Sequence, residues 1–179
     1  MRTAPRLFCC AALLLGLAGC GSSEEPAPAA GPAPDPCALI SQAEAAQALG
    51  QPLKAGKLHE TANPLGQKIC FYAGAQDAPP VRFVQISLVT SAGMQPALRE
   101  QGYDAAKLYA DSRALVAEPQ DVPGLGQAAF FGGGGLKAGA GLHVLKGQAY
   151  LVIQVAGGPP TRQLEAAQGL AAQALARLP

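Results

Sequence analysis

The chain has 179 residues, a formal net charge of +1 and only 14% charged side chains. The charges are spread along the chain without a basic block or an acidic run, which argues against a nucleic-acid-binding protein. Its length suits a single domain of ordinary size once the N-terminal segments are set apart.

The N-terminus has the pattern of an export signal. Arg2 and Arg6 form a basic region, and residues 7–17 form an apolar run. This run is too short for a membrane span, which needs about 20 apolar residues. The run ends in Leu17-Ala18-Gly19-Cys20, which resembles the lipobox of bacterial lipoproteins. We therefore predict that residues 1–19 are a signal peptide.

The lipobox resemblance implies cleavage before Cys20 and lipid attachment to that residue. Its thiol would carry a diacylglycerol and its new amino group a fatty acyl chain such as palmitate, and two or more chains make membrane attachment stable. Gly21 follows, and a residue other than aspartate there resembles outer-membrane sorting. We expect the periplasmic side of the outer membrane in a cell with two membranes, and otherwise the outer face of the cell membrane. The alternative is a secreted protein in which Cys20 is incidental.

Residues 20–36 form the predicted lipidated cysteine and linker, and residues 37–179 a single globular domain. The linker is rich in proline and alanine and has no apolar side chain large enough for a core, so we expect it to be disordered or polyproline-like. Two cysteines remain in the domain, Cys37 and Cys70. In an exported protein they are most simply a disulfide. A metal pair and a reactive thiol are alternatives, although the chain has no C-x-x-C motif.

Helices and strands follow from capping and periodicity. Ser41-Gln42-Ala43-Glu44 is a capping box that predicts a helix to Leu49, which Gly50 and Pro52 end. Apolar alternation and turn residues predict the strands, and the last helix has an apolar stripe. The remaining expected elements are strands at 53–60, 68–73 and 81–90, a helix at 94–101 with a further turn or two at 104–110, strands at 113–117, 128–131, 141–145 and 149–155, and a helix from 159.

This order is helix, three strands, helix, strands, helix. The spacers between strands are short, whereas parallel pairs need long crossovers. We therefore predict an α+β fold with a mostly antiparallel twisted sheet of about six to seven strands and three helices.

Three segments carry a resemblance. They are Asp35–Ala45 (DPCALISQAEA), the strand Cys70-Phe71-Tyr72, and residues 122–130 (VPGLGQAAF). They resemble small bacterial lipoproteins of unknown function, which share a D-P-C-x-L-[L/I]-[S/T]-x-x-E helix start, a later C-x-Y strand and a V-P-G-L-G turn. The resemblance implies the α+β fold and the Cys37–Cys70 bridge, and it brings no catalytic residues.

The two histidines do not indicate a reactive site. His59 precedes Glu60, but neighbouring residues on a strand point to opposite faces. His143 alternates with Leu142 and Val144, which places it on the outer face of the sheet. We interpret both as surface or hydrogen-bonded histidines.

Other residue types give no enzyme signature. Ser87 and Ser91 lack the G-x-S-x-G pattern of a nucleophile elbow. The glycine run 132–135 lacks the Lys-Ser/Thr ending of a phosphate loop and is expected to be a loose hairpin connection. The four tyrosines are interpreted as core-edge residues. We expect no catalytic residue, no metal and no cofactor.

The leading hypothesis is a non-enzymatic cell-envelope lipoprotein, held in the membrane through Cys20, that binds a protein or another envelope component. The alternative is a carrier of a small apolar ligand, held between the sheet and its helices in a cavity left by small side chains. A third reading, an enzyme, requires His59 or His143 to face an acidic residue in a cleft.

Overall fold

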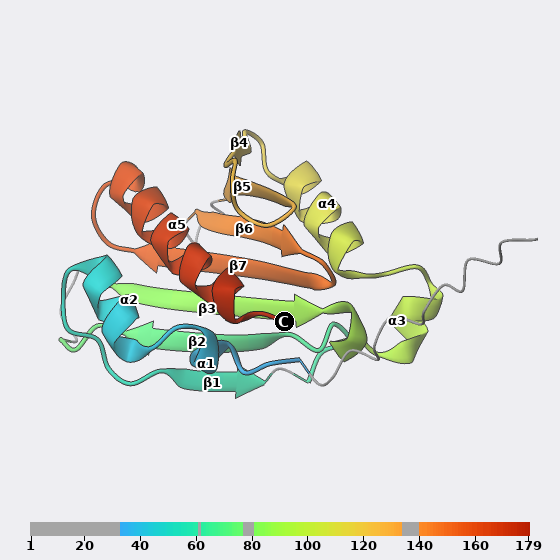
Figure 1. Cartoon of the computed structure of the whole chain (residues 1–179), viewed down its shortest axis with the longest axis horizontal. Helices are drawn as coiled ribbons and strands as arrows, with labels where there is room; N and C mark the ends of the chain where they lie inside the picture. The colour runs from blue at the N-terminus through green and yellow to red at the C-terminus, as the bar shows by residue number, and fades with distance from the viewer. Residues whose placement is uncertain (1–32, 61, 77–80, 134–139) are drawn as a thin grey trace, which may run out of the picture.

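The computed structural model describes residues 33–60, 62–76, 81–133 and 140–179. The predicted signal peptide, Cys20 and most of the predicted linker lie outside these ranges. The described residues form one seven-stranded antiparallel sheet with five α-helices, so the predicted α+β class is confirmed (Figure 1). The predicted number of helices, three, is wrong.

The elements have the following bounds. The strands are β1 (Lys57–Glu60), β2 (Lys68–Ala73), β3 (Phe83–Thr90), β4 (Gln120–Asp121), β5 (Ala128–Gly132), β6 (Gly141–Lys146) and β7 (Ala149–Ala156). The helices are α1 (Pro36–Leu39), α2 (Gln42–Leu49), α3 (Pro96–Glu100), α4 (Ala105–Leu115) and α5 (Pro160–Arg177), with a 3₁₀ turn at Ser91–Gly93.

The strand order is β1-β2-β3-β7-β6-β5-β4, and every neighbouring pair is antiparallel. The last strand of the chain therefore lies in the middle of the sheet. It pairs with β3 over eight positions, including Ile86 with Ile153 and Leu88 with Leu151. These four side chains are 0–1% exposed, so the centre of the core depends on a pairing between distant parts of the chain.

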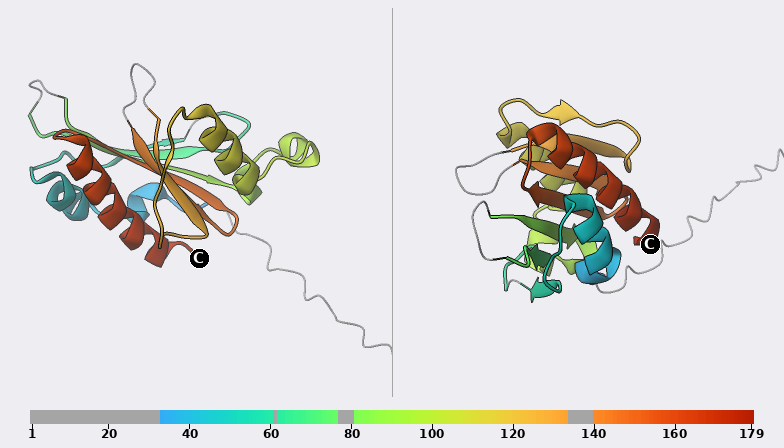
Figure 2. Two further views of the ribbon diagram at one scale, coloured as in Figure 1. Left: turned by 90° about the horizontal axis from the view of Figure 1, so that it is seen from above. Right: turned by 90° about the vertical axis from the view of Figure 1, so that its left-hand side faces the viewer.

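One face of the sheet carries the main core. Helices α1, α2 and α5 lie against it, and α4 lies on the opposite face (Figure 2). The main core is built from alternate strand residues and the inner stripe of α5, because a strand turns every second side chain to the same face. Its fully buried members include Val84, Ile86, Leu142, Ile153, Ala171 and Ala174.

The opposite face has a smaller core under α4. Ala105 and Tyr109 of that helix pack on Phe130 and Tyr150, and the ring centroids of Tyr109 and Phe130 are 5.3 Å apart. Asp104 begins the helix by accepting a hydrogen bond from the Lys107 backbone at 2.7 Å. This helix covers β6 and β7.

Two local expectations differ from the structure. The helical turn or two expected at 104–110 continues to Leu115 as α4, so the predicted strand at 113–117 is wrong. The physical reason is the anchoring of the helix by Ala105 and Tyr109 (both buried), which tertiary packing supplies and local propensity does not. In addition, the four-residue helix α1 and the two-residue strand β4 were not expected.

The packed structure extends into the end of the predicted linker. Ala33 is 7% exposed, and the Lys68 ammonium donates to its backbone oxygen at 3.0 Å. Pro36 is buried as the first residue of α1. Within the described ranges, no helix has the length and apolar character that would let it cross a membrane.

Candidate functional site

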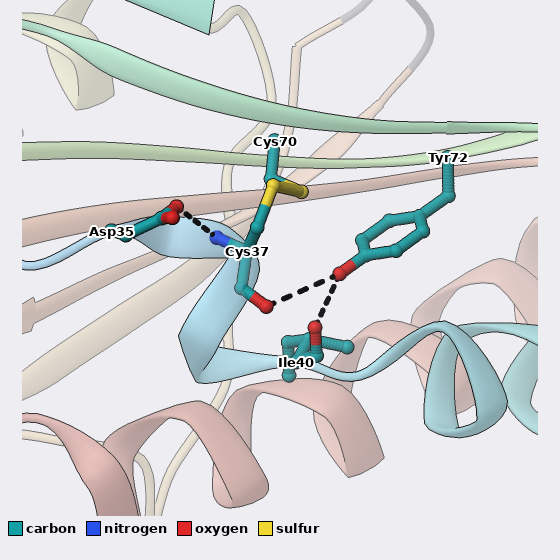
Figure 3. The surroundings of a disulfide bond; sticks show 5 residues. All are labelled: Asp35, Cys37, Ile40, Cys70 and Tyr72. Atoms are coloured by element: carbon teal, nitrogen blue, oxygen red, sulfur yellow. Dashed lines mark hydrogen bonds between the residues drawn. A yellow bond between two sulfur atoms is a disulfide. The ribbon is translucent and has the colours of Figure 1, made fainter. Parts of the chain in front are cut away.

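The predicted lipid site, Cys20, lies outside the described residues. The other two predicted site residues, Cys37 and Cys70, are joined in a disulfide with their Cα atoms 5.1 Å apart (Figure 3). Cys37 lies in α1 and Cys70 in β2, where it is fully buried. The bridge therefore fixes the N-terminal helix to the face of the sheet that carries the main core.

The helix-start motif forms a structural corner around this disulfide. Asp35 caps α1 by accepting from the Cys37 backbone at 2.7 Å, and the Tyr72 hydroxyl donates to the backbone oxygen of Ile40 (Figure 3). Ser41 and Glu44 cap α2 reciprocally, as the sequence predicted. These contacts show that the residues of the helix-start motif stabilise the fold around the disulfide.

Glu44 also links this corner to the last helix. Both of its carboxylate oxygens accept from the Arg177 guanidinium, at 2.6 and 2.9 Å. The side-chain hydrogen bond from Arg177, with further bonds from Ser41, holds the Glu44 pKa at about 2. Arg177 donates in addition to the backbone oxygen of Leu39 at 2.6 Å. The motif therefore positions α1 and α2 against α5 and does not present a reactive group.

The structure separates His59 from its neighbouring acid. His59 is exposed on the edge strand β1, and Glu60 forms an ion pair with Lys68 at 3.0 Å. The two residues do not form a paired acid–base site.

His143 lies on the face opposite Leu142 and Val144, as alternation predicted, but α4 covers that part of the face. Its ring stacks on Phe130 with centroids 4.3 Å apart, and its Nδ1 is hydrogen-bonded to the Tyr150 hydroxyl at 2.6 Å. Tyr150 also bonds the Ser112 side chain of α4. Burial lowers the pKa of His143 to about 4, against a hydrogen bond to the Gly132 backbone that raises it. His143 is a neutral, hydrogen-bonded residue of the smaller core.

This environment predicts a stability loss in mild acid. The folded pKa of about 4 lies below the ordinary histidine pKa of 6.5, so the unfolded chain binds the proton first and stability falls as the pH drops from 6.5 to 4. We expect the free energy of unfolding to fall by roughly 2 kcal/mol over this interval. The measurement is urea unfolding at several pH values. His143→Gln should lose most of this dependence and keep the part below pH 4.5 that the lowered pKa of Glu44 contributes, whereas the exposed-site control His59→Gln should keep all of it. Equal profiles for His143→Gln and the wild type would contradict the assignment.

A pocket of about 510 Å³ lies between α4 and the turn that joins β4 to β5. We call it the hairpin pocket. The turn residues 122–127, which include the V-P-G-L-G motif, line one side, and Tyr109 and Arg113 of α4 line the other. Arg113 forms an ion pair with Asp121 at 2.7 Å and lies 5.5 Å from the centre of the Phe130 ring. The resemblance motif thus forms a wall of a surface pocket.

A second pocket, of about 520 Å³, lies at the end of α4, and we call it the helix-end pocket. It is lined by residues 115–118, Gln120 and the end of β5. Leu115 in this pocket is 87% exposed, more than the other exposed large apolar side chains of the described residues, Val81 and Leu58. The same stretch of chain, from the end of α4 to β4, contributes to both pockets. Arg113 and Asp121 of this stretch line the hairpin pocket, and Leu115 and Gln120 line the helix-end pocket.

Strand β4 gives this region a free backbone edge. It is one of the two terminal strands of the described sheet, it pairs on one side with Phe130 and Phe131, and both of its residues are exposed. An edge strand presents backbone donors and acceptors to which an extended chain can add. The two pockets and this edge together form the candidate binding site.

Sequence reasoning did not find this site. Arg113 and Asp121 meet only because α4 and β4 lie side by side, and nothing local in the sequence marks them as a pair. The V-P-G-L-G turn was the one available signal. Among the described residues, no group of three or more His, Cys, Asp or Glu side chains has an arrangement that could hold a metal ion.

Comparison with known proteins adds no assignment: no protein-family model, curated protein or solved structure matches this chain.

Proposed function

We propose that this protein is a non-enzymatic cell-envelope lipoprotein, anchored by a lipidated Cys20, whose domain binds an extended segment of a partner protein at the β4 edge. The proposal for the anchor rests on the export signal and lipobox of the sequence. A tether raises the local concentration of the domain at the membrane, so even a modest intrinsic affinity suffices.

The observation that carries the binding proposal is the meeting of a free strand edge with two pockets. Residues Gln120 and Asp121 are exposed at the edge, and pockets of about 510 and 520 Å³ are formed beside them. Backbone pairing at an edge supplies affinity, and pockets for side chains supply specificity. Leu115, with 87% of its surface exposed, offers apolar contact area at this site.

The same geometry favours a protein segment over the apolar ligand of the alternative hypothesis. That ligand was expected between the sheet and its helices. In this layer the side chains of Ile86, Leu142, Ile153 and Leu170 are 0–1% exposed and pack in one cluster. The hairpin and helix-end pockets are instead at the surface, where a chain can enter from solvent.

Site-specific photocrosslinking in intact cells tests the binding proposal. A photoreactive amino acid is placed at Leu115 and, in a separate variant, at Gln120, because both line the helix-end pocket. Val81 is the matched control, since it is also apolar and 75% exposed but does not line that pocket. We expect the 115 and 120 probes to label one contiguous segment of the same protein, identified by mass spectrometry, and the 81 probe not to label it.

Labelling of unrelated proteins by the two site probes, or equal labelling by the control, would contradict the binding proposal. The anchor is tested separately with Cys20→Ala, which we expect to move the protein from the membrane to the soluble fraction. A Cys20→Ala protein that remains in the membrane fraction would contradict the anchor without bearing on the β4 edge.

A further inference from the structure

A third pocket, of about 320 Å³, lies at another end of the molecule. It is formed where α2 and β7 end and where β3 and α5 begin, at the left end of the sheet in Figure 1. None of its lining residues belongs to the hairpin pocket or the helix-end pocket. We call it the arginine pocket.

Its charged lining is entirely basic. Arg82 and Arg162 line it, together with Gln47, Gly157 and Gly158, and no acidic residue among those that the structure describes does so. In the described part of the chain, the ion pairs use other residues, and neither Arg82 nor Arg162 takes part in one. Two arginines thus line one pocket, and none of the described residues that line it with them is acidic.

The backbone at Gly157 is shaped to hold Arg82. A Cβ atom at this position would lie 3.1 Å from Cγ and 3.4 Å from Cδ of Arg82, so the aliphatic part of the arginine packs directly on the glycine. Gly157 also has a φ of 125°, a conformation that side chains other than hydrogen disfavour. A glycine at this position lets Arg82 lie across the end of β7 at the pocket.

The start of α5 adds to the positive potential of the pocket. This helix has 18 residues, and no side chain caps its N-terminus. Unpaired backbone N–H groups and the helix dipole favour an anion at such an end. Arg162 lies in this first turn and lines the pocket.

We propose that Arg82 and Arg162 bind a phosphate group in the arginine pocket. Guanidinium groups recognise phosphate through paired N–H···O hydrogen bonds, and two of them match the charge of a phosphate dianion. This binding site goes beyond the proposed partner-binding function and uses none of its residues.

The pocket lies far from the point where the predicted linker joins the domain. Ala33, the first described residue, lies beside Gly93 after the end of β3, because a Cβ atom built on Gly93 would be 3.6 Å from the Ala33 Cβ, whereas Arg82 directly precedes the start of β3. The eight residues of this strand separate the two points by roughly 26 Å, at about 3.3 Å per residue. The phosphate has two possible sources, a soluble phosphate compound and a lipid headgroup, and the experiment separates them.

The soluble source is tested by titrating inorganic phosphate into the full-length, ¹⁵N-labelled protein in detergent and following the arginine Nε–H signals by NMR. Sodium chloride at equal ionic strength is the salt control. We expect saturable shifts for Arg82 and Arg162. Arg82→Gln and Arg162→Gln should each weaken binding by about tenfold or more, since each removes charge-assisted hydrogen bonds. Arg99→Gln is the matched control, because Arg99 is exposed on α3 and remote from the pocket.

The headgroup source is tested by co-sedimentation of the Cys20→Ala protein with vesicles of phosphatidylglycerol or phosphatidylcholine. Binding of inorganic phosphate that both arginine variants weaken supports the site with a soluble ligand. Binding only to vesicles, weakened by the same two variants, supports it with a lipid headgroup. Absence of saturable binding in both assays, or binding that the Arg82→Gln and Arg162→Gln variants leave unchanged, overturns the proposal.

Discussion

Replacing both Cys37 and Cys70 with serine is expected to lower the free energy of unfolding by about 4 kcal/mol. The disulfide closes a long loop, with the two cysteines 33 positions apart in the chain. In the chain-entropy description, such a cross-link restricts the unfolded chain much more than the folded one. The bridge also holds α1 where Leu39 and Ile40 enter the main core. The measurement is guanidinium unfolding of the wild type and the double variant, followed by circular dichroism.

A Cys20→Ala protein is the control for this experiment, because it removes a cysteine outside the described domain and should unfold at the wild-type midpoint. Wild-type protein unfolded with a reducing agent should match the double variant. Two thiols that react with Ellman's reagent in the native, unreduced protein would show that the bridge is absent in solution. An unchanged midpoint in the double variant would show that the bridge contributes nothing to stability.

Replacing Gly126 with alanine is expected to lower the free energy of unfolding by about 3 kcal/mol. Gly126 has a φ of 59°, and a Cβ atom there would lie 2.3 Å from the backbone oxygen of Leu145. Because this oxygen belongs to the backbone of β6, it cannot move away by a side-chain rotation. The same oxygen accepts a hydrogen bond from Gln127 at 2.8 Å, so relieving the clash would also disturb the attachment of the turn to β6.

Gly124→Ala is the matched comparison, since Gly124 lies in the same turn with a φ of 82° but has no atom within 4 Å of the added carbon. It should show only the conformational penalty, about 1 kcal/mol. The difference between the two variants in urea unfolding therefore reports the close approach to Leu145. Equal losses would mean that the turn does not lie against β6 as described.

The elements that the sequence predicted well are those specified by neighbouring residues. Helix α2 is one, because Ser41 and Glu44 cap it locally and Gly50 ends it. Strand β2 is another, and its predicted bounds agree with the structure. Here the alternation of Cys70 and Tyr72 with less buried neighbours follows directly from the two faces of a strand.

The elements that it missed depend on distant contacts. Helix α1 has only four residues and is held by Asp35, the disulfide and the Tyr72 hydroxyl. The sequence of residues 113–117 favours a strand, but the end of α4 is helical because Tyr109 packs the helix on Phe130. His143 was placed on the correct side of its strand, but periodicity within β6 carries no information that another element covers that side.

The sequence did not predict the candidate sites because they, too, depend on contacts between residues that are not neighbours in the chain. The arginine pocket joins Arg82 to Arg162, and the ion pair beside the hairpin pocket joins Arg113 to Asp121. Each pair comes from two elements that only the fold brings together. The lipobox is the opposite case, a short contiguous motif, and its assignment remains a prediction.

The central place of β7 sets the sequence of events during folding. Because this strand is the next-to-last element and lies between β3 and β6, the sheet cannot close until nearly the whole polypeptide has been synthesised. Both Cys37 and Cys70 are made long before β7, so a disulfide between them can form before the sheet closes. A chain interrupted before residue 149 would leave both β3 and β6 without their shared partner, as two separate aggregation-prone edges.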